Sequence, residues 1–289
     1  IFWWSVLVEV PIQVILNGLT IGAIYGLMAI GLSLIFSVVG IANSAHGGFY
    51  LLGAYLGYFF QILGLSVPLA MILAIILVGA IGIVVYRLTI HPILNLHANV
   101  LILTFLLAIL FEQIIRITFG PDYKNLQPLV TGVFEGAGIV MSNQRITASI
   151  LSVILVALLS LFVKRSRLGK AIRMTTQDSE AAQLLGIDVS LIYVLTFGLG
   201  TALTGASAVL AAPLFTLYPA MGWLPFILSF FITISGGLGS VAGALVMGVI
   251  FGLTDAFVSY YIAPTWGLIA AFLVTLIIII VKPQGLLGR

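Results

Sequence analysis

Long apolar runs, separated by short stretches that often contain proline, dominate the pattern of this chain. A helix of about 20 apolar residues spans a bilayer about 30 Å thick. The pattern therefore predicts an all-α, polytopic integral membrane protein with 8 to 9 transmembrane helices, organised as one transmembrane domain over residues 1–289. The predicted spans are residues 11–38, 47–63, 67–90, 98–119, 146–163, 190–212, 222–236, 241–262 and 265–281.

Two of the predicted spans are short and bordered by small residues, near 47–63 and 222–240. Lipid cannot satisfy free backbone groups, so an interrupted helix inside a bilayer is expected where it lines a cavity. We therefore predict re-entrant or broken helices in both places. The similar spacing of small residues in 53–57 and 243–248 also predicts an internal repeat that relates these two stretches.

Composition narrows the possible function. Hydrophobic residues make up 62% of the chain and charged residues 7%, and the mean hydropathy is +1.30. Soluble domains carry about 25% charged residues, so a soluble catalytic domain is excluded. The chain has no cysteine, which excludes disulfides and thiolate chemistry. The net charge of +3 is not arranged as a basic stripe with aromatic residues, and we expect no nucleic-acid partner.

The positions of the basic residues predict the orientation. Positive residues collect on the cytoplasmic side of membrane proteins. With nine crossings, the hydrophilic loop 164–190 is cytoplasmic, the loop 120–145 is extracytoplasmic, and the C-terminus is cytoplasmic; an even count would move the N-terminus inside. Eight of the 11 basic residues then lie on the cytoplasmic side: Arg87, Lys164, Arg165, Arg167, Lys170, Arg173, Lys282 and Arg289.

The loop 164–190 contains the signature of a short helix. Thr175 or Asp178 can cap its N-terminus, and Gly186 stands where a helix often ends in the left-handed conformation. Ala181, Leu184 and Leu185 share one face. Short isolated helices are marginal in water, so this apolar face predicts docking into a groove of a soluble partner.

Several segments resemble one known family. Glu180-Ala181-Ala182 followed by Gly186-Ile187 resembles the coupling loop of ABC importer permeases, and residues 169–190 resemble the version found in branched-chain amino acid permeases. The stretch 43–55, which begins Asn-Ser-Ala-His-Gly-Gly, resembles the signature of that family, as do 235–244 and the C-terminal Lys-Pro-Gln-Gly-Leu. Ser44 and Gly48 depart from the usual signature and leave the solute open. The absence of an N-terminal extension favours the LivH over the LivM type.

The resemblance implies a transport subunit of the inner membrane, which moves branched-chain or related amino acids and has no catalytic or metal site. It also implies four partners: two ATP-binding cassette ATPase subunits, a second permease of LivM type, and an extracytoplasmic solute-binding protein. ATP and Mg would bind the ATPases, because this chain lacks a phosphate-binding glycine loop that ends in Gly-Lys-Ser/Thr. The coupling residues would be Gly169, Arg173, Asp178, Glu180, Ala181, Ala182, Leu185 and Gly186.

Polar side chains within the spans are candidates for a translocation path or gate, because such residues usually face an interior. Glu112 and Arg116 are four residues apart, which predicts a local ion pair. Asp255 is expected either to meet Arg116 or to line water at the outer mouth. His46, placed near the inner boundary, is expected to bind backbone freed by the break, to contribute to the gate, or to do both. The path candidates are Asn17, Tyr25, Asn43, Ser44, His46, Gly47, Glu112 and Asp255.

Three alternatives stay open at this point. A permease of the same family for urea or another small solute would share these motifs. A stand-alone secondary transporter would use Glu112 and Asp255 as proton or ion sites. An intramembrane enzyme would pair His46 with a carboxylate, but the sequence has no acid near His46 and no His-x-x-x-His or Glu-x-x-His pattern.

Overall fold

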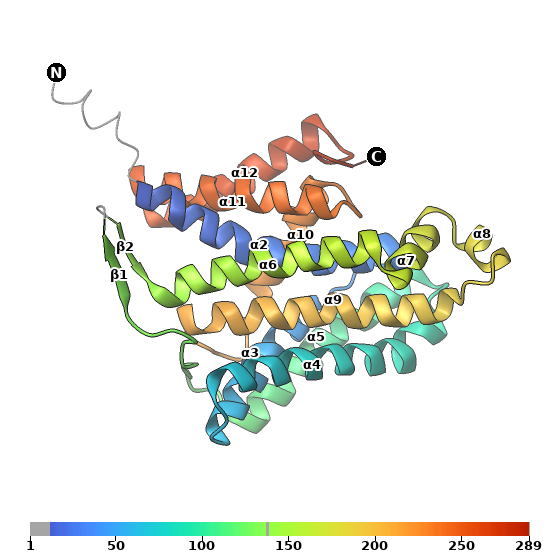
Figure 1. Cartoon of the computed structure of the whole chain (residues 1–289), viewed down its shortest axis with the longest axis horizontal. Helices are drawn as coiled ribbons and strands as arrows, with labels where there is room; N and C mark the ends of the chain where they lie inside the picture. Colours follow the sequence, from blue (N-terminus) through green and yellow to red (C-terminus); the bar gives the residue numbers. More distant parts are fainter. Residues whose placement is uncertain (1–11, 137–138, 289) are drawn as a thin grey trace.

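The computed structural model describes residues 12–136 and 139–288. Its helices run along one long axis between two ends of the molecule (Figure 1). We call the end that carries the only hairpin of the described residues the hairpin end, and the opposite end the α8 end. The prediction about the side of the N-terminus falls on residues 1–11, which lie outside the described residues.

The first half of the chain supplies three long helices, one shorter helix and the hairpin. Its elements are α2 (Ile12–Val39), α3 (His46–Ile62), α4 (Val67–Val85), the π-helix η1 (Tyr86–Ile90), the 3-10 turn η2 (His91–Ile93), α5 (His97–Phe119), β1 (Val133–Gly136) and β2 (Ile139–Ser142). The antiparallel strands pair from Val133 with Ser142 to Gly136 with Ile139. This hairpin lies in the predicted extracytoplasmic loop, and the apolar pattern did not predict it.

The second half of the chain begins with the helix that follows the hairpin. Its last described residues lie near the α8 end. Its elements are α6 (Asn143–Arg165), α7 (Arg167–Gln177), α8 (Ser179–Leu184), α9 (Val189–Ala211), the 3-10 turn η3 (Ala212–Leu214), α10 (Trp223–Gly236), α11 (Val241–Tyr261) and α12 (Pro264–Val281). Among the described residues, seven helices are long and apolar enough to cross a membrane. Two further helices inside the bundle, α3 and α10, are shorter, with 17 and 14 residues.

Both short helices are the second parts of broken crossings. Helix α2 ends at the α8 end, where Ser37 contacts Gly239, but α3 ends at the hairpin end, where Gln61 bonds the backbone of Gln127. Residues 40–62 therefore pass through the whole bundle. Residues 215–236 do the same in the opposite direction, since Leu217 pairs with Lys124 at the hairpin end. Together with the seven long helices they make nine crossings in the described part, within the predicted range.

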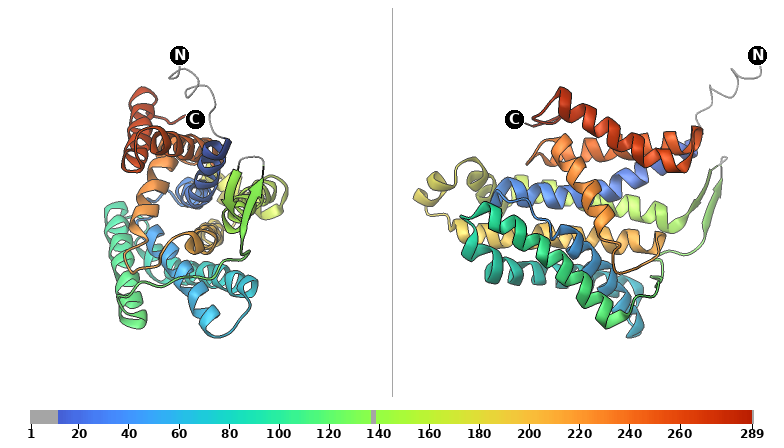
Figure 2. Two further views of the ribbon diagram at one scale, coloured as in Figure 1. Left: turned by 90° about the vertical axis from the view of Figure 1, so that its left-hand side faces the viewer. Right: turned by 180° about the vertical axis from the view of Figure 1, so that it is seen from behind.

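The packing relates two halves that run in opposite directions. Helix α2 packs on α11 as α9 packs on α4, and α10 packs on α2 as α3 packs on α9. Helices α2 and α9 lie at the centre of the bundle when it is viewed from the hairpin end (Figure 2), and they are its most buried spans. The repeat thus relates α2–α4 to α9–α11. The predicted correspondence of 53–57 with 243–248 was wrong, because these stretches lie on α3 and α11, which are not equivalent.

Candidate functional site

The two broken helices meet at their N-termini inside the bundle. Gly47, in the first turn of α3, lies against Gly222, which precedes α10. A Cβ atom on Gly47 would lie 2.6 Å from the carbonyl oxygen of Gly222. Only two glycines allow the chains to approach this closely, because any side chain would overlap the opposite backbone. We call this contact, with the residues around it, the α3–α10 junction.

Neither helix that starts at the junction has a side-chain cap among the described residues. The first turn of an uncapped helix exposes N–H groups and the positive end of the helix dipole. In the break before α3, the amide of Ser44 donates to Thr104 Oγ1 at 3.2 Å, and the amide of Ala45 donates to Asn43 Oδ1 at 3.1 Å. These bonds hold the non-helical backbone in place inside the bundle. The junction therefore presents two positive helix ends at one place.

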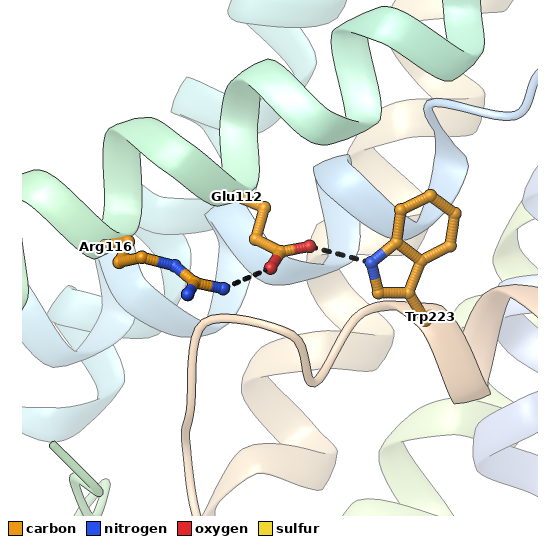
Figure 3. Close-up of polar contacts among 3 residues, drawn as sticks. All are labelled: Glu112, Arg116 and Trp223. Atoms are coloured by element: carbon orange, nitrogen blue, oxygen red, sulfur yellow. Dashed lines mark hydrogen bonds and ion pairs between the residues drawn. The ribbon is translucent and has the colours of Figure 1, made fainter. Parts of the chain in front are cut away.

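Glu112 brings a negative charge to the junction from α5 (Figure 3). Its Oε1 accepts a hydrogen bond from Arg116 Nη2 at 2.6 Å, and its Oε2 accepts one from Trp223 Nε1 at 2.8 Å. The predicted local ion pair is confirmed. The side chain of Arg116 is 48% exposed and that of Glu112 is 13% exposed, so only the carboxylate is turned inward. The Trp223 bond ties α5 to the first residue of α10.

A cavity of about 10 Å³ lies at the junction, which is room for about one water molecule. Its lining contains one charged group, the carboxylate of Glu112. The lining residues are Ser44, Gly47, Gly48, Leu51, Ala108, Glu112, Pro219, Gly222 and Trp223. Three predicted path residues, Ser44, Gly47 and Glu112, thus lie together. The cavity is too small for an amino acid, so the described conformation is closed at this point.

His46 lies deeper than predicted. Its ring is fully buried, and Nε2 lies 3.0 Å from the carbonyl oxygen of Met28, near the middle of α2, and 3.0 Å from Thr204 Oγ1 of α9. The predicted position near the inner boundary was wrong, because the chain turns back into the bundle before α3 begins. The acceptor also belongs to α2 and not to the break. The ring joins three helices next to the junction, with Asn43 buried beside it.

Two further path candidates lie elsewhere. Asn17 and Asp255 line a separate cavity near the hairpin end, together with Arg145. Asn17 Oδ1 accepts a hydrogen bond from Arg145 Nη1 at 3.0 Å. Arg116 pairs with Glu112, and no ion pair of Asp255 is found in the described part of the chain. Of the two roles predicted for Asp255, this leaves the lining of water at the outer mouth. Tyr25 packs partly buried against the core and lines neither cavity.

The loop 164–190 forms two helices at the α8 end. Ser166 caps α7 through the amide of Gly169 at 2.8 Å, and Arg173 donates to the carbonyl oxygen of Val163. Gly169 packs on α6 so closely that a Cβ would lie 2.5 Å from the Val163 oxygen. These contacts fix α7 against the end of α6. Helix α7 in turn sets the position at which α8 begins.

Helix α8 is short and mostly exposed. Asp178 caps it by accepting from the amides of Glu180 and Ala181, each at 3.0 Å, so Asp178 and not Thr175 is the cap. Gly186 follows the helix at φ +80°, in the left-handed region, as predicted. Ala182 is buried, whereas Leu184 is 90% and Leu185 is 69% exposed. The predicted apolar face exists and is uncovered in this chain.

The helices with interrupted crossings are typical of membrane transporters. A profile of the family described as "Branched-chain amino acid transport system / permease component" matches residues 14–281. The chain belongs to this family. It is a permease subunit of an ABC importer, a multi-pass inner membrane protein that works as a transport component and not as an enzyme. ABC permeases work with ATPase and solute-binding partners, and this permease therefore works with partners of these two kinds.

Named relatives cover nearly the whole chain. It is 31% identical to the high-affinity branched-chain amino acid transport permease BraD of Pseudomonas aeruginosa, over 96% of each chain. It is 28% identical to LivH of Escherichia coli, again over 96% of each. A solved structure of PsaBC from Streptococcus pneumoniae with a Fab shares the fold, with a TM-score of 0.50 and 17% identity over 93% of this chain and 91% of that one.

Three residues of these sites were not predicted: Trp223, Thr204 and Arg145. Trp223 had a signal, since it stands beside Gly222 at the start of a span already predicted to be broken. Thr204 and Arg145 had none, because a threonine in a helix and an arginine near a helix start are common. The described residues contain no group of three or more His, Cys, Asp or Glu placed to hold a metal ion.

Proposed function

We propose that this permease moves branched-chain or related aliphatic amino acids toward the cytoplasm, with the α8 end on the cytoplasmic side. The names of the relatives support the solute class. The basic residues support the orientation, since Lys164, Arg165, Arg167, Lys170 and Arg173 gather in α6 and α7 at the α8 end. The C-terminus, which follows α12 at the same end, is then cytoplasmic, and the hairpin is extracytoplasmic.

The observation that carries the proposal is the exposed apolar face of α8. Leu184 and Leu185 stand on a helix fixed to the bundle by α7 and by the buried Ala182. Apolar side chains at such exposure favour a partner surface. We assign this face to the ATPase, with Glu180 at the positive start of the helix. Two ATPases, a second permease of LivM type and an extracytoplasmic binding protein complete the proposed assembly.

Energy is supplied by the partners in this proposal. The chain lacks a phosphate-binding glycine loop that ends in Gly-Lys-Ser/Thr, so ATP and Mg belong to the ATPases and this chain holds no cofactor. An ATPase dimer that binds two permease conformations with different affinity shifts the population between them. The α7–α8 segment would transmit that difference to α6 and α9, on which it is mounted.

The path in this proposal passes the α3–α10 junction. Two uncapped helix starts favour the carboxylate of an amino acid, and Glu112 favours its ammonium group. Passage requires the junction to open, since the present cavity of about 10 Å³ holds about one water. Glu112 would then exchange its bond to Trp223 for one to the solute.

The test is reconstitution with candidate ATPases and the second permease, followed by ATPase assays over leucine, isoleucine, valine and urea. We expect stimulation by the aliphatic amino acids together with the binding protein. Glu180→Lys should abolish stimulation while the complex still inserts, and Lys124→Gln, at the opposite end, is the matched control. Stimulation by urea and not by the amino acids would identify urea as the transported solute. Uptake by the chain without ATPases, driven by an ion gradient, would establish the secondary transporter instead.

Glu112→Gln tests the path separately. The amide keeps an oxygen for Trp223 but loses the charge, so stability should change by about 1 kcal/mol or less, because the Arg116 side of the pair is half exposed. Leucine uptake should fall about tenfold or more. Unchanged uptake in this variant would show that the path does not pass the junction. It would leave the role proposed for α8 unaffected.

A further inference from the structure

A second cavity, distinct from the junction, lies between α2, α6 and α11 near the hairpin end. Helices α2 and α11 are in backbone contact along Gly18, Gly22, Gly248 and Gly252. The cavity opens where this glycine contact ends, and its volume is about 270 Å³. Its lining residues are Val14, Asn17, Ile21, Arg145, Asp255, Ala256, Ser259 and Tyr260. This volume is close to the lower bound for small-molecule sites, about 300 Å³.

The cavity carries one positive and one negative side chain that do not touch. Arg145 comes from the first turn of α6 and is held by Asn17, with Nη1 3.0 Å from Asn17 Oδ1. Asp255 comes from α11 and accepts a hydrogen bond from Ser259 at 3.5 Å. The ion pairs found among the described residues are Glu112 with Arg116 and Asp122 with Lys124. Arg145 and Asp255 are therefore more than 4.0 Å apart and face the same space.

The surrounding helices keep the two charges apart. Helix α12 packs against Asp255 at Gly267, where a Cβ would lie 2.5 Å from Asp255 Oδ1. Asn17 likewise holds the guanidinium on the α2 side. Charged groups at membrane depth are costly unless paired or hydrated, and a direct ion pair would be the cheaper arrangement. The cavity of about 270 Å³ that both side chains line is suited to a ligand or to several waters.

We propose that this cavity binds a small zwitterion with an ammonium group and an anionic oxygen group. The oxygens contact Arg145, which presents a planar fork of donors, and the ammonium contacts Asp255. Val14, Ile21 and Ala256 receive the apolar part of the ligand. Two sources share this chemistry: a free α-amino acid, and the phosphoethanolamine headgroup of a lipid at the membrane surface. The site is independent of whether transport passes the α3–α10 junction.

The experiment uses the purified full chain in detergent, without ATPases. Phosphatidylethanolamine and phosphatidylglycerol are titrated separately and followed by native mass spectrometry, and radiolabelled leucine is followed by equilibrium dialysis. We expect one saturable site for leucine or for phosphatidylethanolamine. Asp255→Asn should weaken it at least tenfold and remove any preference for phosphatidylethanolamine over phosphatidylglycerol. Arg145→Gln should weaken binding of both lipids.

Matched variants keep the test decisive. Lys124→Gln and Asp122→Asn neutralise a surface ion pair at the same end and should leave binding unchanged. Ile21→Phe fills part of the cavity without removing a charge and should also weaken binding, which covers the case in which a charge variant fails to fold. Leucine binding alone identifies a free amino acid, and phosphatidylethanolamine binding alone identifies a lipid. Absence of saturable binding, or binding that none of the three cavity variants changes, overturns the proposal.

Discussion

The α3–α10 junction and the α7–α8 segment both depend on glycine, but for opposite physical reasons. At the junction, Gly47 has no room: a Cβ would lie 2.6 Å from the backbone oxygen of Gly222. After α8, Gly186 has free space, with nothing within 4 Å of a Cβ, but its φ of +80° disfavours any other residue. The first glycine serves packing between distant segments, and the second serves the local backbone.

The conformation of the junction is therefore determined by tertiary contacts, and that of α8 by residues close to it in the chain. The junction is held by bonds between α5 and α10 and between α2, α3 and α9, which join residues 18 to 158 positions apart. The α8 helix is held by a cap two and three residues away and by a glycine that ends it. Substitutions should therefore damage the junction through crowding or lost partners, and α8 through modest local costs.

The largest effect is expected for Gly47→Ala. The added methyl group overlaps the Gly222 backbone, and overpacking of this kind costs about 1–3 kcal/mol or more. The thermal unfolding temperature in detergent and the rate of leucine uptake should both fall. Gly26→Ala is the matched control, because its Cβ would meet only Gly248 Cα, at 3.9 Å. Equal stability of the two variants would mean that the junction can open at little cost.

The next effect is expected for His46→Ala. The substitution removes a fully buried ring that bonds the Met28 carbonyl oxygen and contacts Thr204. Loss of such partners costs about 1–3 kcal/mol, so the free energy of unfolding should fall by that amount. Uptake per folded molecule distinguishes the two roles: it stays normal if the ring is structural. A loss of uptake at unchanged stability would instead place His46 in the gate.

A smaller effect is expected for Gly186→Ala. The left-handed conformation costs a residue with a Cβ about 1–2 kcal/mol, and no clash adds to it. Stimulated ATPase activity of the reconstituted complex should fall while the chain remains inserted. Gly186→Asn should fall less, since asparagine tolerates this conformation better. The same loss in both variants would indicate a direct contact at this position, not a backbone requirement.

The smallest effect is expected for Asp178→Ala. An N-cap contributes about 1 kcal/mol, and the cost falls on a six-residue helix at the surface. Amide hydrogen exchange at residues 180–185 should speed up while global stability stays within about 1 kcal/mol. Asp178→Ser retains a capping oxygen and should behave like the natural chain. Unchanged exchange after Asp178→Ala would show that α8 is held by Ala182 packing instead.

Much of the fold followed from the sequence because membrane spans obey simple length and composition rules. The seven long helices, the two broken crossings and the Glu112–Arg116 pair were all predicted, and the α8 cap was narrowed to Thr175 or Asp178; each depends on residues close in the chain. The depth of His46 and the correct repeat were missed. The first depends on the path of residues 40–45 back into the bundle, and the second on contacts between helices that are distant in the chain; no local pattern records either.

Sequence alone determined the long apolar helices, the glycine at which α8 ends, and which ionic pair forms within one helix, since these follow from periodicity and near neighbours. Only the tertiary structure decided that Trp223 binds Glu112, that Gly47 meets Gly222, and that Arg145 and Asp255 face one cavity. A helix such as α2 is apolar on nearly all sides, so its pattern does not show which face meets which neighbour. Close packing of glycine surfaces supplies that information instead.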